Sequence, residues 1–180
     1  MSTSNTKDKV LELDALAERC RKLRAEGKRI VHCHGVFDLL HLGHVRHFQA
    51  ARKNGDVLVV TLTQDAWVNK GPHRPAFGHV LRCEMLANLE CVDYVAVNRW
   101  PTAVPTIDLL RPHIYAKGSD YADESKDVTG GIRREREAVE SVVGKILFTN
   151  EATFSSSTLI NRHMPVLSEA ARDFIDSLSA

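Results

Sequence analysis

The chain has 180 residues, of which 43% are hydrophobic and 26% are charged, and its formal net charge at pH 7 is +1. This length is most simply one domain with a sizeable core, and the near-neutral charge gives no electrostatic reason to expect nucleic acid or an anionic membrane as a partner. No apolar run approaches the roughly 18 residues that span a bilayer. The polar start also lacks the hydrophobic centre of a secretory signal.

The four cysteines show no Cys-x-x-Cys spacing, which disfavours a zinc site or disulfides. Cys33 and Cys91 lie among apolar neighbours, so free buried thiols in a reducing compartment are the prediction. Composition and cysteine usage together predict a cytoplasmic protein that does not insert into a membrane.

Helices and strands are predicted to alternate along the chain. Residues 1–9 are expected to be frayed, and the apolar spacing over residues 11–26 predicts a helix that ends at Gly27. Further helices are predicted over residues 45–54, 77–90, 101–110, 131–143, from 155 onward and over 165–179. Strands are predicted over residues 29–33, 56–63, 92–97, 114–116 and 145–149, with polar loops over 65–75 and 121–129.

Strands that are apolar throughout indicate a parallel sheet covered on both faces. Their alternation with helices predicts a doubly wound α/β fold with a five-stranded parallel sheet, in which ligands bind where the carboxyl ends of strands meet helix starts. The predicted organisation is an N-terminal helical extension over residues 1–27, one domain over residues 28–162, and a C-terminal helix over residues 163–180 packed on that domain.

Residues 35–44 read Gly-Val-Phe-Asp-Leu-Leu-His-Leu-Gly-His, between a predicted strand and a predicted helix. The first turn of a helix leaves backbone N–H groups unpaired and carries the positive end of the helix dipole, so it binds anions. Gly35 and Gly43 let the backbone approach a ligand, and His41 and His44 can add ring N–H donors to phosphate oxygens. Such histidines can also be simple helix caps, but the glycines and the preceding strand favour a phosphate site.

This His-x-Gly-His stretch behind a strand resembles the mark of the cytidylyltransferase-like nucleotidyltransferases. The resemblance implies a Rossmann-like fold of the nucleotidylyltransferase type, in which His41 and His44 hold the phosphates of a nucleoside triphosphate. It also implies that Asp38 and the backbone around Val36 and Phe37 shape the same turn. Class I aminoacyl-tRNA synthetases use a related motif, but this chain is short for one and has no Lys-Met-Ser-Lys-Ser loop.

Cationic residues follow two other predicted strands. Lys70 and Arg74 lie in the loop after the second strand, where they form either a solvated face or clamps on a triphosphate. Arg82 lies on the next predicted helix, placed to point back at the same spot. Together with His41, His44 and Lys70 it is predicted as a catalytic residue that neutralises charge growing on the phosphates. Lys117 and Gly118 end the fourth strand, where the lysine either extends into solvent or contacts a phosphate or base.

A run of hydroxyl residues begins the helix predicted from residue 155. Such residues commonly cap a helix and do nothing more, but facing a nucleotide they can also bind a phosphate through hydroxyl and N–H groups together. The candidates for this contact are Ser156, Ser157 and Thr158.

From about residue 28 to residue 160 these clusters, in this order, resemble the adenylyltransferase domain of the bifunctional enzymes that make ADP-heptose. The resemblance implies phosphate contacts at His41, His44 and Lys70. It places Asp120, together with the Lys-Gly pair at 117–118, near the base and ribose. The residues that it implies in supporting roles are Arg82, Ser156 and Thr158.

Glycerol-3-phosphate cytidylyltransferases share the first turn but carry an Arg-Thr-Glu-Gly-Ile-Ser-Thr run before the last helix. This sequence has Glu151 and Ala152 in place of the Arg and Thr, and Phe154 in place of the glycine. Phe154 also departs from the glycine of the heptose enzymes. His34 stands where these families usually carry Asn or Tyr, so it either touches the substrate or simply sits in the strand.

The predicted function is transfer of a nucleoside monophosphate from ATP or CTP to a phosphorylated sugar or polyol, with release of pyrophosphate and with Mg²⁺ bridging triphosphate oxygens. No dedicated metal site is predicted, although His44 and His47, three residues apart on a helix, could share an ion. Related enzymes are often dimers, so the resemblance implies a homodimer. Nucleic acid and membranes are not expected as partners.

Four alternatives remain open from the sequence. The first is a CTP-specific polyol-phosphate cytidylyltransferase, and the second is an adenylyltransferase for phosphopantetheine or a mononucleotide. The third is a nucleotide-binding module without activity, and the fourth is a metal-binding protein. The sequence does not identify the acceptor, and it favours ATP over CTP only weakly.

Overall fold

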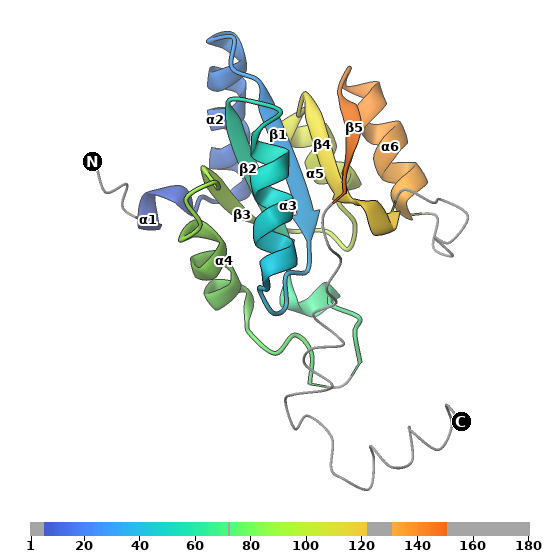
Figure 1. Cartoon of the computed structure of the whole chain (residues 1–180). Coiled ribbons are helices and arrows are strands. Elements are labelled where there is room, and N and C mark those ends of the chain that lie inside the picture. Colours follow the sequence, from blue (N-terminus) through green and yellow to red (C-terminus); the bar gives the residue numbers. More distant parts are fainter. Residues whose placement is uncertain (1–5, 72, 122–130, 151–180) are drawn as a thin grey trace, which may run out of the picture.

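The computed structural model describes residues 6–71, 73–121 and 131–150 (Figure 1). Within them the strands form one sheet in which neighbouring strands pair in parallel, in the order β3-β2-β1-β4-β5. The strands are β1 (Ile30–Gly35), β2 (Val57–Thr63), β3 (Tyr94–Asn98), β4 (Ile114–Gly118) and β5 (Lys145–Thr149). This arrangement confirms the predicted doubly wound α/β fold.

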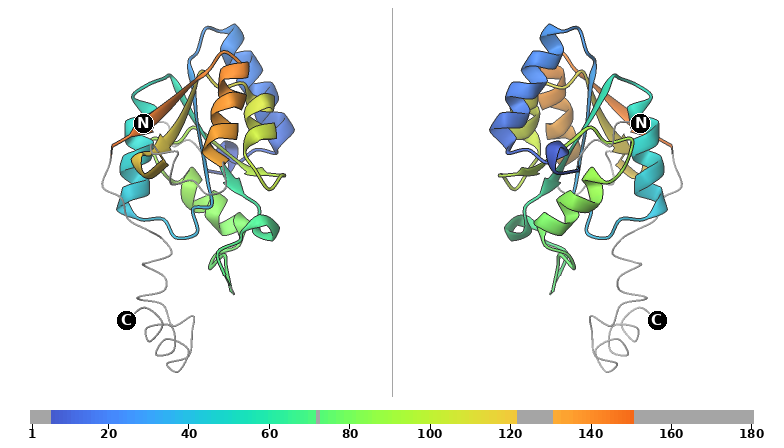
Figure 2. Two further views of the ribbon diagram at one scale, coloured as in Figure 1. Left: turned by 90° about the vertical axis from the view of Figure 1, so that its right-hand side faces the viewer. Right: turned by 90° about the vertical axis from the view of Figure 1, so that its left-hand side faces the viewer.

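Helices cover both faces of the sheet. Side views show α3 (Leu42–Arg52) and α4 (His79–Ala87) on one face, with α2 (Leu13–Ala25), α5 (Val104–Leu110) and α6 (Gly131–Ser141) on the other (Figure 2). The remaining described elements are short: α1 (Thr6–Lys9) and the 3₁₀ turns η1 (Asp65–Trp67) and η2 (Ser119–Tyr121).

The apolar strands predicted this layering because their side chains alternate between two buried faces. All seven residues of β2 are buried. On one face Val31 and Cys33 pack in a core cluster with Phe48 of α3. On the other, Ile30 packs in a cluster with Leu13 of α2. Each face of the sheet therefore has its own core.

The strand order reverses between β1 and β4, at the centre of the sheet. The chain passes from β1 to β2 through α3 and from β2 to β3 through α4, on one face, whereas α5 and α6 lie on the other. In open parallel sheets the crevice beyond the strand ends at such a reversal is where ligands bind. The carboxyl ends of β1 and β4 flank this crevice.

Some of the predicted ends of helices and strands differ from the observed ends by a few residues. Residues 6–9 form α1 where frayed chain was expected, and Lys9 Nζ donates to the backbone oxygens of Leu89 at 3.2 Å and Val92 at 2.8 Å. Helix α4 begins at His79, two residues later than predicted, and β4 continues to Gly118, two residues further. The predicted loop over 122–129 and the helices after residue 150 lie outside the described residues.

Helix α2 is part of the main core, because Leu13, Leu16 and Cys20 are buried against the sheet. The predicted boundary after residue 27 stays a prediction, as do those at 162 and 163, which fall beyond the described chain. All four cysteines are free, and three of them are buried. In the part of the chain that the structure describes, no helix combines the length and apolarity needed to cross a bilayer.

Candidate active site

The turn between β1 and α3 is built around the ring of Phe37. This residue adopts a left-handed backbone conformation, with φ of 50°, and its side chain is only 7% exposed. The ring packs edge-on against the rings of His44 and Phe48, with centroids 5.2 Å away in each case. A Cβ at Gly35 would lie 2.9 Å from this ring, so glycine is needed there for the turn to close over Phe37.

His41 and His44 form the amino end of α3. His41 is the N-cap residue, and its Nδ1 accepts the backbone N–H of His44 at 3.3 Å. The two rings stack with centroids 3.7 Å apart. Desolvation lowers the pKa of both imidazoles, that of His44 to about 3, with further lowering of the His44 value from the charges of His41, His47 and Lys70. Both rings are therefore neutral at pH 7.

Asp38 ties the loop after β2 to this turn. Its carboxylate is fully buried and accepts from Arg74 Nη1 at 2.7 Å and from the backbone N–H of Ala76 at 2.6 Å. The Arg74 side chain is only 3% exposed, and its buried Nη2 finds no hydrogen-bond partner among the described residues. Lys70, on the same loop, is exposed.

Arg82 lies behind the turn rather than in front of it. Its guanidinium is completely buried and donates to the backbone oxygens of Phe77 at 2.9 Å, Val36 at 2.5 Å and Thr63 at 2.9 Å. Its Nη2 also donates to Asp65 Oδ1 at 2.5 Å. The side chain was predicted to point at a ligand, but these contacts instead join the end of β1, the end of β2 and the start of α4.

Asp65 also forms the start of α4. One carboxylate oxygen, Oδ2, accepts the backbone N–H of His79 at 3.0 Å and lies 2.7 Å from His79 Nδ1. These hydrogen bonds lower the pKa of Asp65 against the raising effect of its partial burial. Asp65 was not predicted as a site residue, although a carboxylate directly after an apolar strand was an available signal.

Lys117 closes the opposite side of the crevice, at the end of β4. Its ammonium lies 2.8 Å from Glu135 Oε2 on α6 and sits over the rings of Tyr115 and Tyr121, at 5.3 Å and 4.9 Å from their centroids. Glu135 was not predicted, because nothing in the spacing of α6 distinguishes it from its charged neighbours. Lys117 is thus nearly buried beside α6, with its charge partly neutralised by Glu135.

The structure brings most of the predicted residues to one edge of the sheet. The turn at 35–44 carries Gly35, Val36, Phe37, Asp38, His41, Gly43 and His44. Lys70 lies on the loop tied to this turn, and Lys117 and Gly118 end the neighbouring strand β4. The backbone of Asp120 belongs to η2. Ser156, Ser157 and Thr158 lie outside the described residues.

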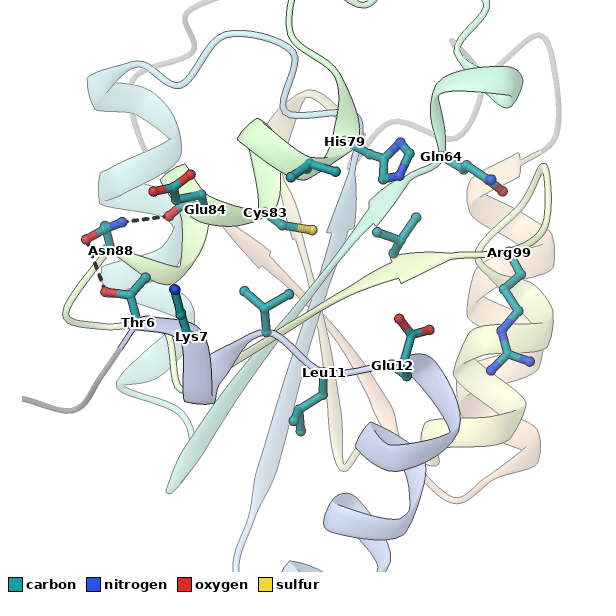
Figure 3. A pocket seen from close by; sticks show the side chains of 13 residues that line it. Thr6, Lys7, Leu11, Glu12, Gln64, His79, Cys83, Glu84, Asn88 and Arg99 are labelled. Atoms are coloured by element: carbon teal, nitrogen blue, oxygen red, sulfur yellow. Dashed lines mark hydrogen bonds between the residues drawn. The ribbon is translucent and has the colours of Figure 1, made fainter.

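A separate pocket of about 760 Å³ lies along the outer edge of β3, between α4 and the N-terminal segment (Figure 3). Its lining mixes charges of both signs from Lys7, Glu12, Glu84 and Arg99, and Arg99 pairs with Asp14 at 2.5 Å. None of the residues predicted for the phosphate site lines it. The mixed charges indicate no single class of ligand.

The described residues contain no group of three or more His, Cys, Asp or Glu side chains that could hold a metal ion. The two oxygens of Asp38 are both engaged by donors of the protein, so this carboxylate is not a ready ligand. His47, suggested as a partner of His44 in a shared ion site, instead has Nδ1 2.6 Å from the Thr149 hydroxyl. Proteins usually bind Mg²⁺ through one or two carboxylates together with the phosphate oxygens of a substrate.

The site can be compared with known proteins by three features. These are the order of the strands, the histidine pair at the start of α3, and Lys117 at the end of β4. A family profile described as cytidylyltransferase-like matches residues 32–163. The chain belongs to this family. Membership confirms the resemblance noted from the His-x-Gly-His turn and the predicted class of enzyme, a nucleotidyltransferase.

Curated relatives extend well beyond this chain. "Bifunctional protein HldE" of Pelobacter propionicus is 41% identical over 162 residues, which cover 89% of this chain and 32% of the relative. The protein of the same name from Geobacter sulfurreducens is 44% identical over 140 residues, which cover 77% of this chain and 27% of the relative. The chain therefore spans about a third or less of the length of these relatives.

Solved structures with the same fold are more distant in sequence. A lipopolysaccharide core biosynthesis protein from Thermoplasma volcanium aligns with a TM-score of 0.58 at 24% identity and covers 71% of this chain and all of that chain. A pantoate-beta-alanine ligase from Francisella tularensis, complexed with Beta-gamma ATP and beta-alanine, aligns with a TM-score of 0.61 at 13% identity, over 93% of this chain and 76% of that chain. These likenesses show the fold.

Proposed function

We propose that this chain is an adenylyltransferase that moves AMP from ATP to the phosphate group of a phosphorylated sugar, of the heptose phosphate type, and releases pyrophosphate. The high identity to proteins named HldE supports this choice of donor and acceptor. The observation that carries the proposal is the stacked pair of neutral histidines at the amino end of α3, facing the crevice between β1 and β4.

In this proposal the triphosphate binds across the start of α3. The positive end of the helix dipole and the first N–H groups of α3, apart from that of His44, which His41 accepts, favour the anion. His41 and His44 donate ring N–H groups to phosphate oxygens. Lys70 adds a positive charge from the loop that Asp38 ties to the turn. The unused Nη2 of Arg74 is a further donor on the same loop.

The acceptor's phosphate oxygen attacks the α-phosphorus of ATP, and a new P–O bond forms. The bond from the α-phosphorus to the bridging oxygen of the β-phosphate breaks, and its electron pair leaves with pyrophosphate. Because the attacking oxygen is already anionic, no strong general base is needed. Catalysis then depends on positioning and on donors aimed at the charge that grows on the α-phosphate and the leaving group.

Mg²⁺, when bound with the nucleotide, would supply positive charge to the triphosphate oxygens. The chain's own residues have other tasks. Lys117, beside the aromatic rings of Tyr115 and Tyr121, and the adjoining Gly118 and Asp120 are proposed to lie near the base and ribose. Ser156, Ser157 and Thr158 are proposed as additional phosphate donors. Arg82 is proposed to act indirectly, by holding the turn and the loop in place.

Pyrophosphate release tests the proposal directly. The purified chain would be incubated with each of ATP, CTP, GTP and UTP against heptose phosphates, glycerol 3-phosphate, phosphopantetheine and a mononucleotide. We expect release with ATP and a sugar phosphate, and formation of the matching nucleotide sugar. Release only with CTP and glycerol 3-phosphate would replace the proposal by the cytidylyltransferase alternative. Binding of nucleotide with no release for any acceptor would support a module without activity.

We further propose that the chain works as a homodimer in the cytoplasm, without nucleic acid or membrane partners. Light scattering of the purified chain measures its mass in solution. A monomer at all concentrations would refute the first part of this proposal while leaving the chemistry untouched.

A further inference from the structure

A row of hydrogen-bonding side chains lies under the carboxyl edge of the sheet, on the face away from α3. Side chains alternate between the faces of a strand, and Ile30 packs with α2, so His32 and His34 share that face with Thr61 and Thr63 of the neighbouring strand β2. His32 and Thr61 are completely buried. His34, two residues nearer the strand end, is partly exposed.

The Thr61 hydroxyl lies between two imidazoles. Its Oγ1 is 2.8 Å from His32 Nε2 and 2.9 Å from His34 Nδ1. The other nitrogen of His34, Nε2, is 3.4 Å from Thr63 Oγ1, a long contact. Burial, with the charge of Lys117, lowers the pKa of His32 to about 3 and that of His34 well below its ordinary value, so each ring carries one proton at pH 7.

The proton positions follow from counting donors. The Nδ1 of His32 is buried and has no hydrogen-bond partner among the described residues. A buried N–H without an acceptor is rarer and costlier than an acceptor without a donor, so the proton of His32 is on Nε2 and is donated to Thr61. The Thr61 hydroxyl then has its own proton left to donate to Nδ1 of His34. His34 therefore carries its proton on Nε2.

This chain of hydrogen bonds fixes an N–H donor at the end of β1. Among the described residues, the Nε2–H group of His34 has the long contact to Thr63 of β2, and the ring also lies near the Thr61 backbone. Its place at the end of β1 leaves it close enough to β4 for the charge of Lys117 to lower its pKa. The amino end of α3, with His41 and His44, lies on the opposite face of the sheet. His34 therefore presents its donor on the face of the sheet opposite to His41 and His44.

We propose that His34 is a specificity-determining residue that donates its Nε2–H to a hydroxyl or ring oxygen in the sugar part of the acceptor, and that His32 and Thr61 are positioning residues that set its tautomer. This inference rests on the proposed function for the identity of the bound partner. The hydrogen-bond chain itself does not depend on that function. A neutral donor suits an uncharged oxygen, whereas the acceptor's phosphate is served by the cationic groups of the site.

The tautomer is measured by the ¹⁵N chemical shifts of the histidine rings in the intact chain, without substrate. We expect His34 to be protonated on Nε2 at pH 7.5, and we expect Thr61→Val to shift it toward protonation on Nδ1, because valine keeps the shape of threonine but gives up no proton. Thr6→Val, at the start of α1 where the hydroxyl donates to Asn88, is the matched control and should leave the shifts unchanged. A charged His34, or one protonated on Nδ1 in the native chain, would overturn the hydrogen-bond chain.

The role in binding is measured by steady-state kinetics. His34→Ala should raise KM for the phosphorylated acceptor about tenfold and KM for ATP less than twofold, as expected for one hydrogen bond lost to one substrate. His34→Gln, which retains a side-chain N–H donor, should recover part of the loss. Equal effects on both substrates, or none, would refute the role of His34. If the native chain showed no transfer with any acceptor, the proposed function would fail while the measured tautomers still tested the chain of hydrogen bonds.

Discussion

At the scale of single residues, the candidate site depends on side chains whose charge has been suppressed by burial. His44 is neutral because desolvation lowers its pKa to about 3, so it offers a phosphate one N–H donor without burying an unpaired positive charge. The guanidinium of Arg82, in contrast, donates to Asp65 and to three backbone carbonyls. Both residues were predicted to neutralise the charge of bound phosphates. Their surroundings differ, because Arg82 is engaged by the protein itself.

His44→Ala should lower kcat about a hundredfold or more while the fold stays intact, because one donor to the transition state is lost, worth about 2–4 kcal/mol. Pyrophosphate release gives the rate, and circular dichroism reports the fold. His113→Gln, at the amino end of the sheet where His113 Nδ1 accepts the N–H of Ile30, is the control. A folded His44→Ala enzyme with near-normal turnover would refute the assignment of His44.

Arg82→Ala should destabilise the chain by about 3–5 kcal/mol, because the carboxylate of Asp65 and the buried carbonyl of Thr63 lose their donor. Urea unfolding measures this loss. Arg99→Ala breaks the exposed pair with Asp14 and should cost about 1 kcal/mol or less. An Arg82→Ala chain of native stability that no longer binds ATP would instead make Arg82 a direct ligand of the phosphates.

At the scale of elements, the start of α3 and the loop between β2 and α4 act together because of Asp38. Its buried carboxylate fastens Arg74 and Ala76 to the turn, which keeps Lys70 close enough for its charge to lower the pKa of His44. The phosphate site therefore consists of a helix start and a loop that are separate in sequence and joined by one side chain.

Asp38→Asn should weaken ATP binding about tenfold, because the amide keeps the size of the carboxylate but loses the charge that holds Arg74. Calorimetry with ATP measures the affinity. Asp108→Asn, on α5 where the residue is exposed, is the matched control and should bind ATP as the native chain does. Native affinity in Asp38→Asn would mean that the loop needs no such anchor.

At the scale of the whole molecule, the neutral buried histidines make stability depend on pH. The folded pKa of His32 is about 3 and that of His47 about 4, whereas in the unfolded chain both lie near the ordinary value of about 6.5. Below pH 6.5 the unfolded chain binds more protons than the folded chain, so the free energy of unfolding decreases as the pH falls toward these folded values. Above pH 6.5 this contribution is constant and fully present.

His32→Gln should reduce the pH dependence of stability between about pH 6 and pH 4, since each such histidine contributes up to about 1.4 kcal/mol per pH unit. Urea unfolding at a series of pH values gives the slope for the native chain and the variant. Because carboxylates titrate equally in both proteins, the difference between the slopes isolates His32. Identical slopes would show that His32 is already protonated in the folded chain.

Much of the fold was predictable because its signals are local. Continuous apolar runs such as residues 57–63 can only be buried on both faces, which requires helices above and below the sheet. The glycine turn before α3 follows from the spacing of Gly35, His41 and His44 within ten residues. The start of α4 and the ordered α1 were missed, because Asp65 and Lys9 make contacts with residues far along the chain.

The sequence alone determined the parallel α/β layering and the phosphate-handling turn, since both arise from neighbours in the chain: hydrophobic alternation, glycine and a helix start. Only the tertiary structure decided which charged residues face the crevice and which serve the fold. Arg82 and Lys70 look alike in sequence, but packing buries the first behind β2 and exposes the second. The same packing sets the protons of His32 and His34, because a tautomer depends on partners that come from another strand.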